Sequence, residues 1–120
     1  MSNNPILSYR DLIVWQTAMD VRREVRKIVL AIPRQDRFEI GGQITRAAWS
    51  IPCNIAEGHA RMDRRDYKQF LSYARGSAGE LDTQLVALSE DHPHLVTRID
   101  PIILKLWEDA RMITTIMKKL

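Results

Sequence analysis

Apolar residues recur every three or four positions in four separate segments of this 120-residue chain. Such spacing places them on one face of an α-helix and predicts that each helix buries a single stripe. No segment shows the alternation of apolar and polar residues that is typical of a half-buried strand. The four stripes are Val14, Ala18, Val21, Val25, Ile28 and Ile32; Ile40, Ile44, Ala47, Ile51 and Ile55; Tyr67, Leu71, Ala74, Ala78, Leu81, Leu85 and Leu88; and Ile103, Leu106, Ala110, Ile113, Met117 and Leu120.

Helix-breaking residues separate these stripes. Pro33 is expected to end the first helix, residues 58–63 to separate the second from the third, and His92-Pro93-His94 to close the third. Helices of about 20 to 28 residues joined by short loops bury their stripes most economically against one another. We therefore expect an all-α fold, an antiparallel up-down-up-down four-helix bundle. It forms one domain over residues 1–120, with residues 1–8 as a flexible N-terminal segment.

Capping residues predict where two of the helices begin. Asp63 has the short acceptor side chain that favours the N-cap position of the third helix. Asp100 is the corresponding residue of the fourth helix, because Pro101 follows it at the first helical position.

Pro52 lies in the middle of the second stripe. A proline inside a helix removes a backbone donor and clashes with the carbonyl four residues before it, at a cost of about 3 kcal/mol. The apolar period continues on both sides of Pro52, which predicts one helix with a proline kink.

The third helix carries Gly76 and Gly79 near its middle, within the string ARGSAGEL. A glycine inside a helix costs about 1 kcal/mol relative to alanine, so the pair predicts close approach of another backbone or of a ligand. The third helix is then expected to face the second there and to form a polar network with it. The predicted network consists of Asn54, Glu57, Arg75 and Glu80, in a structural role.

The composition favours a soluble cytoplasmic protein. Cys53 is the only cysteine, which excludes an intramolecular disulfide and suits a reducing compartment. The first residues do not have the pattern of a secretory signal, and no run approaches the length of about 20 apolar residues that a membrane-spanning helix requires.

Positive charge is concentrated in the first two-thirds of the chain. Residues 1–79 contain 13 Lys or Arg and 8 Asp or Glu, a net charge of +5, and residues 80–120 contain 5 and 7, a net charge of −2. Clustered guanidinium groups match phosphate geometry, which favours nucleic-acid binding. A merely solvated face stays open as an alternative, because Asp63 and Asp66 lie among the cations. The candidate contacts are Arg22, Arg23, Arg26 and Lys27 on the first helix, and Arg61, Arg64, Arg65 and Lys68 around the start of the third.

Large apolar side chains fall outside the first stripe. Leu12, Trp15 and Met19 project to the outer side of the first helix, where the core of the bundle does not bury them. An outward apolar cluster on a soluble protein is typical of an interface. We expect these three residues, together with Trp49, to contact another subunit of a homo-oligomer.

Catalytic and metal-site motifs are not found in the sequence. The histidines His59, His92 and His94 do not occur in HExxH or ExxH, and phosphate-binding glycine motifs and the GxSxG motif are missing. The expectation is a protein that is not an enzyme and uses no cofactor or metal. A hydrolase that uses Glu57 and Arg75 is the least favoured alternative.

Three separated strings resemble one known family. SIPCNIAEG, preceded by QITRAAW and followed by YKQFLSYARGSAGEL, and the opening YRDLIVWQTAMD are similar to the proteins encoded by intervening sequences in bacterial large-subunit rRNA genes. The accessory protein of diversity-generating retroelements is a related member. The resemblance covers about residues 9–120. It departs at Trp49, where the family usually has a small or β-branched residue, and at Cys53, where it usually has serine.

The resemblance implies an assembly and a ligand class. Members of this family are bundles that form homopentamers, and the retroelement member is thought to bind nucleic acid and a reverse transcriptase. The expected function is therefore an oligomeric, non-catalytic accessory protein that contacts RNA or DNA backbone and partners a reverse transcriptase or rRNA. A structural scaffold that contacts an acidic protein and ignores nucleic acid is the alternative.

Overall fold

The computed structural model describes residues 6–120, and the described chain is all-α, as expected. The first five residues of the predicted flexible segment 1–8 lie outside the described residues. Residues 6–120 contain no strand, and none of their helices has the length and hydropathy of a membrane-spanning segment. The elements are a 3-10 turn η1 (Tyr9–Asp11), α1 (Ile13–Ala31), the short α2 (Arg34–Asp36), a π-helical turn η2 (Arg37–Gly41), α3 (Gly42–Ala60), α4 (Arg64–Asp91), a 3-10 turn η3 (Pro93–Leu95) and α5 (Val96–Lys118).

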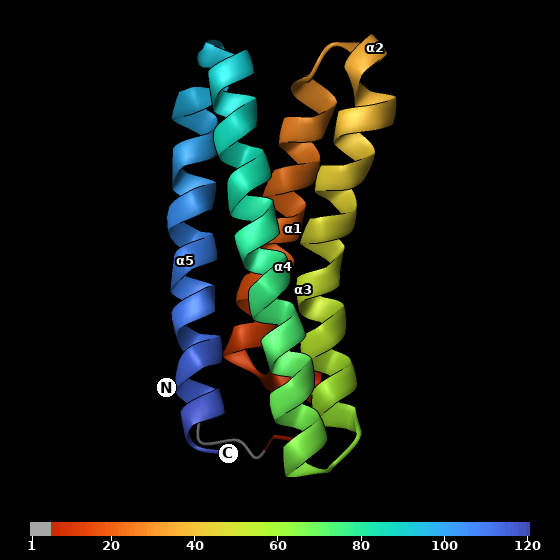
Figure 1. Ribbon diagram of the computed structural model, residues 1–120, viewed down its shortest axis with the longest axis vertical. Coiled ribbons are helices and arrows are strands. Elements are labelled where there is room, and N and C mark those ends of the chain that lie inside the picture. Colours follow the sequence, from red (N-terminus) through yellow and green to blue (C-terminus); the bar gives the residue numbers. More distant parts are fainter. Residues whose placement is uncertain (1–5) are drawn as a thin grey trace.

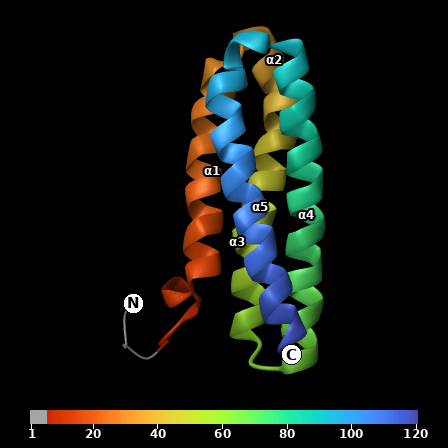
Figure 2. The ribbon, with the colours of Figure 1, turned by 90° about the vertical axis from the view of Figure 1, so that its left-hand side faces the viewer.

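The four long helices lie side by side along the 43 Å axis of the molecule (Figure 1). α1 packs against α3 and α5, and α4 packs against the same two helices. Seen from the side, α1 runs up to the end of the bundle that carries α2, and α5 begins at the same end and runs down (Figure 2). The α3–α4 connection lies at the opposite end of the bundle (Figure 1).

The predicted stripes form the core of this bundle. Their residues are buried or, for Tyr67, Ile103, Met117 and Leu120, half-buried against the core. Ile40 is the exception, with 39% of its surface exposed. It lies in η2, whose wider π-helical turn changes the angular position of each residue relative to an α-helix. The stripe of α3 therefore begins at Ile44, and the prediction for Ile40 was wrong.

One of the two capping predictions is confirmed. α1 ends at Ala31, before Pro33, and the carboxylate of Asp63 accepts the backbone N–H of Asp66 at 2.9 Å, which caps α4. The prediction that Asp100 caps the last helix was wrong. α5 begins at Val96, because Pro93 starts the preceding 3-10 turn, and Pro101 lies inside the helix.

Pro52 is buried inside α3, and the helix continues on both sides of it. Two residues earlier, the Ser50 hydroxyl forms a 2.7 Å hydrogen bond with the hydroxyl of Ser77 on α4. This bond places the middle of α3 against the middle of α4, the two regions that the sequence predicts to face each other.

Another helix approaches two glycines closely: a Cβ atom at Gly41 would lie 2.9 Å from Cγ1 of Val29 on α1, and Gly58 faces α4. A Cβ atom at Gly58 would lie 2.7 Å from the Cβ of Phe70 and 3.1 Å from the ring of Tyr67, whereas Gly76 and Gly79 have open space at that position. The predicted approach of another backbone to Gly76 and Gly79 is therefore not found within residues 6–120, and the predicted approach of a ligand stays a prediction. α4 therefore packs directly against the backbone of α3 at Gly58, near the connection that joins them.

Candidate nucleic-acid interface

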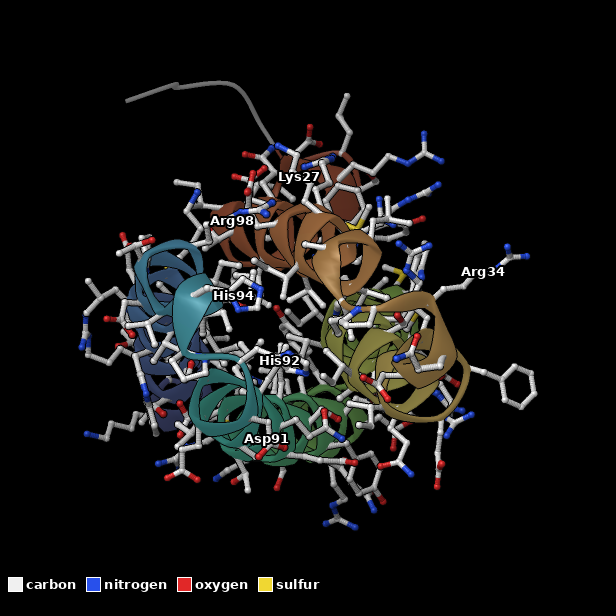
Figure 3. All side chains as sticks on the ribbon, turned by 90° about the horizontal axis from the view of Figure 1, so that it is seen from above. Lys27, Arg34, Asp91, His92, His94 and Arg98 are labelled. Carbon is white, nitrogen blue, oxygen red and sulfur yellow. The ribbon has the colours of Figure 1, made fainter. Side chains whose placement is uncertain are left out.

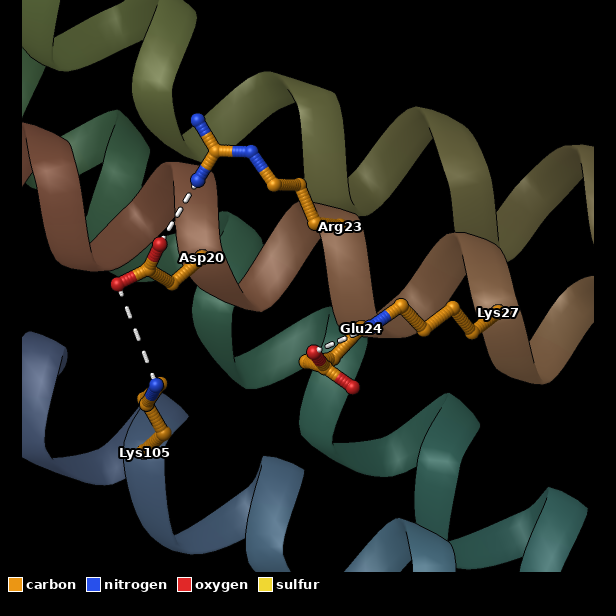
Figure 4. Close-up of polar contacts among 5 residues, drawn as sticks. All are labelled: Asp20, Arg23, Glu24, Lys27 and Lys105. Carbon is orange, nitrogen blue, oxygen red and sulfur yellow. Dashed lines mark hydrogen bonds and ion pairs between the residues drawn. The ribbon is translucent and has the colours of Figure 1, made fainter.

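The basic residues of α1 divide between its two flanks. Arg22 and Arg26 line a cavity between α1 and α3, and Lys27 lines a cavity between α1 and α5. Arg23 donates to Asp20 at 2.7 Å and Lys27 to Glu24 at 3.1 Å, both within α1 (Figure 4). The four predicted residues therefore do not form one undivided patch.

On the α3 flank, Arg22 lies against Trp49. The Cζ atom of the Arg22 guanidinium lies 4.4 Å from the centroid of the Trp49 ring, a distance at which a cation is attracted to the aromatic face. The Nε atom of Arg22 is buried and has no hydrogen-bond partner among the described residues. The adjoining cavity of about 260 Å³ has no acidic residue in its lining, which consists of Arg22, Val25, Arg26, Thr45, Ala48 and Trp49.

On the α5 flank, three cations surround a cavity of about 330 Å³. Lys27 comes from α1, and Arg98 and Lys105 come from α5; Lys105 also lies 4.0 Å from the carboxylate of Asp20 (Figure 4). Lys27 and Arg98 project from neighbouring helices near the α2 end of the bundle (Figure 3). Glu24 is the one acidic residue in this lining. Arg98 and Lys105 could not be found from the sequence, because they are isolated cations in a segment of net negative charge.

The second predicted group lies at the α3–α4 connection, far along the bundle from α2 (Figure 1). Arg61 is neutralised there: it donates to Glu57 at 3.2 Å, lies 3.8 Å from Asp66, and stacks 4.7 Å from the ring centroid of Phe70. Arg64 donates to the backbone carbonyl of Lys119 at 3.4 Å. Arg65 and Lys68 are exposed and have no carboxylate within 4.0 Å among residues 6–120.

The four residues of the predicted polar network do not meet. Asn54 donates to the carbonyl and hydroxyl of Ser50, Glu57 pairs with Arg61, and Glu80 accepts a long 3.5 Å bond from Gln84. Arg75 is exposed and makes no side-chain hydrogen bond to residues 6–120. The predicted network was wrong because Asn54, Glu57 and Glu80 find their partners four residues away along the chain, and Arg75 stays exposed. Glu57 and Arg75, the pair considered for hydrolysis, do not contact each other.

A wider cavity opens on the other flank of α3, toward α4. Its volume is about 740 Å³, and Trp49 lines it as well as the cavity toward α1. Arg46 contributes its positive charge, and Glu80 comes from α4. Arg46 was not among the predicted contacts, although its position three residues before Trp49 places both on one side of a helix. The lining is Gln43, Arg46, Ala47, Trp49, Ser50, Cys53 and Glu80.

The predicted outward apolar cluster is largely covered by the chain itself. Leu12 and Trp15 pack against the core, and the ring of Tyr9 meets that of Trp15 edge-on at 5.4 Å. Met19 is half-buried, whereas Trp49 keeps 43% of its surface exposed. The premise that the core does not bury Leu12 and Trp15 was wrong, because η1 packs against both α1 and α3 and extends the core toward them.

Asp109 is an acid inside the core. It is 1% exposed, and neither carboxylate oxygen has a hydrogen-bond partner among the described residues. Burial raises the pKa of Asp109 to about 8, and the nearby negative charge of Glu108 adds to the rise. Asp109 is therefore largely protonated at neutral pH and does not attract cations to the interior.

The sequence of this chain matches the model of one known protein family. The family model of the 23S rRNA-intervening sequence protein matches residues 10–115, which include all four long helices almost entirely. The chain belongs to this family. The resemblance noted in the sequence is thereby confirmed for the rRNA intervening-sequence proteins.

The fold is shared with a solved structure. A protein of unknown function from the S23 ribosomal protein family of Bacteroides thetaiotaomicron is similar with a TM-score of 0.80 and 21% sequence identity, over 88% of this chain and 99% of that chain. A search of curated proteins finds no match. At this identity the likeness concerns the fold alone.

Proposed function

We propose that the chain is an oligomeric, non-catalytic accessory protein that binds the phosphate backbone of RNA or DNA along α1. The observation that carries the proposal is the pair of cation-lined cavities on the two flanks of this helix. Arg22 and Arg26 line one cavity, and Lys27, Arg98 and Lys105 line the other.

The balance of charge around these cavities supports an anionic ligand. The two linings together contain five cations and one carboxylate, Glu24. Several cations along one surface bind a nucleic-acid backbone through the release of its counterions, which makes the affinity fall steeply with salt. Arg61 and Lys27 are paired with carboxylates. Arg22 and Arg26 have none within 4.0 Å among residues 6–120, so these two are the α1 cations to test first.

The family supports RNA as the ligand and the oligomer as the working form. Its name, 23S rRNA-intervening sequence protein, fits RNA in the cytoplasm as the first ligand to test. We take the protomer as an antiparallel four-helix bundle and its assembly as a homopentamer, which follows from the family resemblance. A ring of subunits repeats the α1 surface and converts weak contacts into avidity. rRNA or a reverse transcriptase is the proposed partner.

Binding across a salt series tests this function. Fluorescence anisotropy of labelled structured RNA and of duplex DNA is measured with the wild type, Arg22→Ala/Arg26→Ala, and Arg111→Ala/Lys118→Ala. The last variant removes two exposed cations of α5 that line neither cavity. The α1 variant is expected to lose about tenfold or more in affinity at low salt and to lower the salt slope by up to about 2, whereas the control variant changes little.

Lack of binding at low salt contradicts the proposal and favours the scaffold alternative, in which the same cations contact an acidic protein. Light scattering of the wild type then tests the oligomer separately. A monomer at micromolar concentration contradicts the oligomeric part of the proposal.

A further inference from the structure

We infer that Trp49 stacks an unpaired nucleobase in the cavity between α3 and α4, while Arg46 binds an adjacent phosphate. The inference rests on the proposed function and specifies its ligand as single-stranded nucleic acid.

Trp49 has the position and exposure of a stacking platform. It forms the ridge between the cavity toward α1 and the cavity toward α4, since it lines both. Arg22 covers one face of the indole at 4.4 Å, yet 43% of the residue stays exposed. An indole held in this way has little freedom to lose on binding, and aromatic side chains stack any base because every base has a flat π-face.

The α3–α4 cavity has groups for both parts of a nucleotide. The amide of Gln43 and the carboxylate of Glu80 offer donors and acceptors to the edge of a base, whereas the Ser50 hydroxyl is already bonded to Ser77 and Asn54. Arg46 is the only cation in the lining and has no carboxylate within 4.0 Å among residues 6–120. Glu80 repels phosphate, so the phosphate is directed to Arg46.

The cations on both flanks of Trp49 define a path for the strand. Arg46 lies on the α4 side of the indole, and Arg22 and Arg26 lie on the α1 side. A strand that crosses α3 thus meets a cation before and after the stacked base. Bases in a duplex are stacked on one another and do not present a free face, so this arrangement selects unpaired nucleotides.

The test compares a single-stranded RNA of about 12 nucleotides, within the range of site sizes known for single-strand binding, with an abasic oligomer of the same length and charge. Both are titrated against the full-length wild type, Trp49→Ala and Trp107→Ala. Trp107 on α5 is a matched control, because it is 47% exposed and lines neither of the cavities beside Trp49. Circular dichroism and light scattering check the folding and the subunit number of each variant.

The expected result is that Trp49→Ala weakens binding of the RNA by about tenfold and leaves binding of the abasic oligomer unchanged, while Trp107→Ala changes neither. If Trp49→Ala weakens both oligomers equally, or neither, the stacking site is refuted and the proposed backbone binding stands. If Trp49→Ala also changes the subunit number and lowers binding of both oligomers, Trp49 is a subunit contact and the inference is refuted. If the wild type binds neither oligomer at low salt, the inference is refuted, and the separate titrations with structured RNA and duplex DNA decide whether the proposed backbone binding fails as well.

Discussion

The two ends of the α3–α4 interface are built in opposite ways. Near the connection, Gly58 lies so close to α4 that a Cβ atom would clash with Phe70 at 2.7 Å. At mid-length the helices touch through the Ser50–Ser77 hydrogen bond, and beside it lies the cavity of about 740 Å³, while Gly76 faces open space. The two helices are thus packed tightly near the connection, and the α3–α4 surface is open at mid-length. The open surface is therefore the place to look for a ligand.

The largest expected change in the free energy of unfolding comes from Asp109. It makes stability depend on pH and therefore sets the pH at which the two regions are compared. The unfolded chain releases the Asp109 proton at about pH 4, whereas the folded chain keeps it until the pH approaches about 8. Protonated Asp109 favours the folded state. This contribution to the free energy of unfolding is full below pH 4 and is lost as the pH rises through 8. An asparagine amide at this position carries no charge at any pH, so Asp109→Asn is expected to gain several kcal/mol relative to wild type as the pH rises between these limits.

Urea unfolding of wild type and Asp109→Asn at a series of pH values measures this gain. A difference between the two proteins that stays constant with pH would show that Asp109 is not held protonated. The glycine variants below are compared at one acidic pH, where Asp109 is neutral in wild type as well.

The next largest effect is expected at the tight end. Gly58→Ala places a methyl group 2.7 Å from the Cβ of Phe70, a backbone-proximal atom that does not move without its helix. Overpacking of this kind costs about 1–3 kcal/mol. Urea unfolding measures the loss, and an unchanged midpoint would mean that α3 and α4 are not locked together near the connection.

At mid-length, beside the α3–α4 cavity, a glycine substitution is expected to raise the free energy of unfolding rather than lower it. Gly76→Ala adds a methyl group in open space within a helix, which stabilises the fold by up to about 1 kcal/mol. The same variant leaves the groups that line the α3–α4 cavity in place. A loss of stability would reveal that another surface covers Gly76 in the assembled protein, and light scattering would then show whether the subunit number falls.

The smallest effect separates packing from charge at the tight end. Arg61 pairs with Glu57 and lies over Phe70, but about half of its side chain is exposed, at 48%. Exposed ion pairs contribute about 0.2–1 kcal/mol, so Arg61→Ala is expected to cost less than Gly58→Ala. Unfolding in low and high salt checks this order. A larger loss for Arg61→Ala would mean that charge rather than packing holds this end.

The core of the fold could be predicted because burial follows the helical period directly. The stripe of α1 illustrates this, since each of its residues from Val14 to Ile32 is buried. Ile40 could not be predicted, because the π-helical turn that displaces it leaves no mark in the spacing of apolar residues. The prediction that the core does not bury Leu12 and Trp15 was wrong for a related reason. A helical projection considers α1 alone, whereas η1 adds a second surface against which they pack.

Less of the candidate site could be predicted, because it depends on which helices are neighbours. Arg22 and Arg26 were found from their spacing in α1. Their partner Arg46 belongs to another helix, and the neutralisation of Arg61 depends on the positions of nearby carboxylates. Spacing along one helix shows charge, and only packing shows whether that charge is free to bind a ligand.

Cys53 provides a single thiol through which the α3–α4 cavity can be labelled. It is the only cysteine of the chain, it is exposed, and it lines the cavity together with Trp49 and Arg46. A thiol-reactive fluorophore or spin label therefore attaches at one position without any substitution. In a symmetric assembly each protomer would carry one such label, and the distances between labels would report the number and spacing of the subunits from within the cavities themselves.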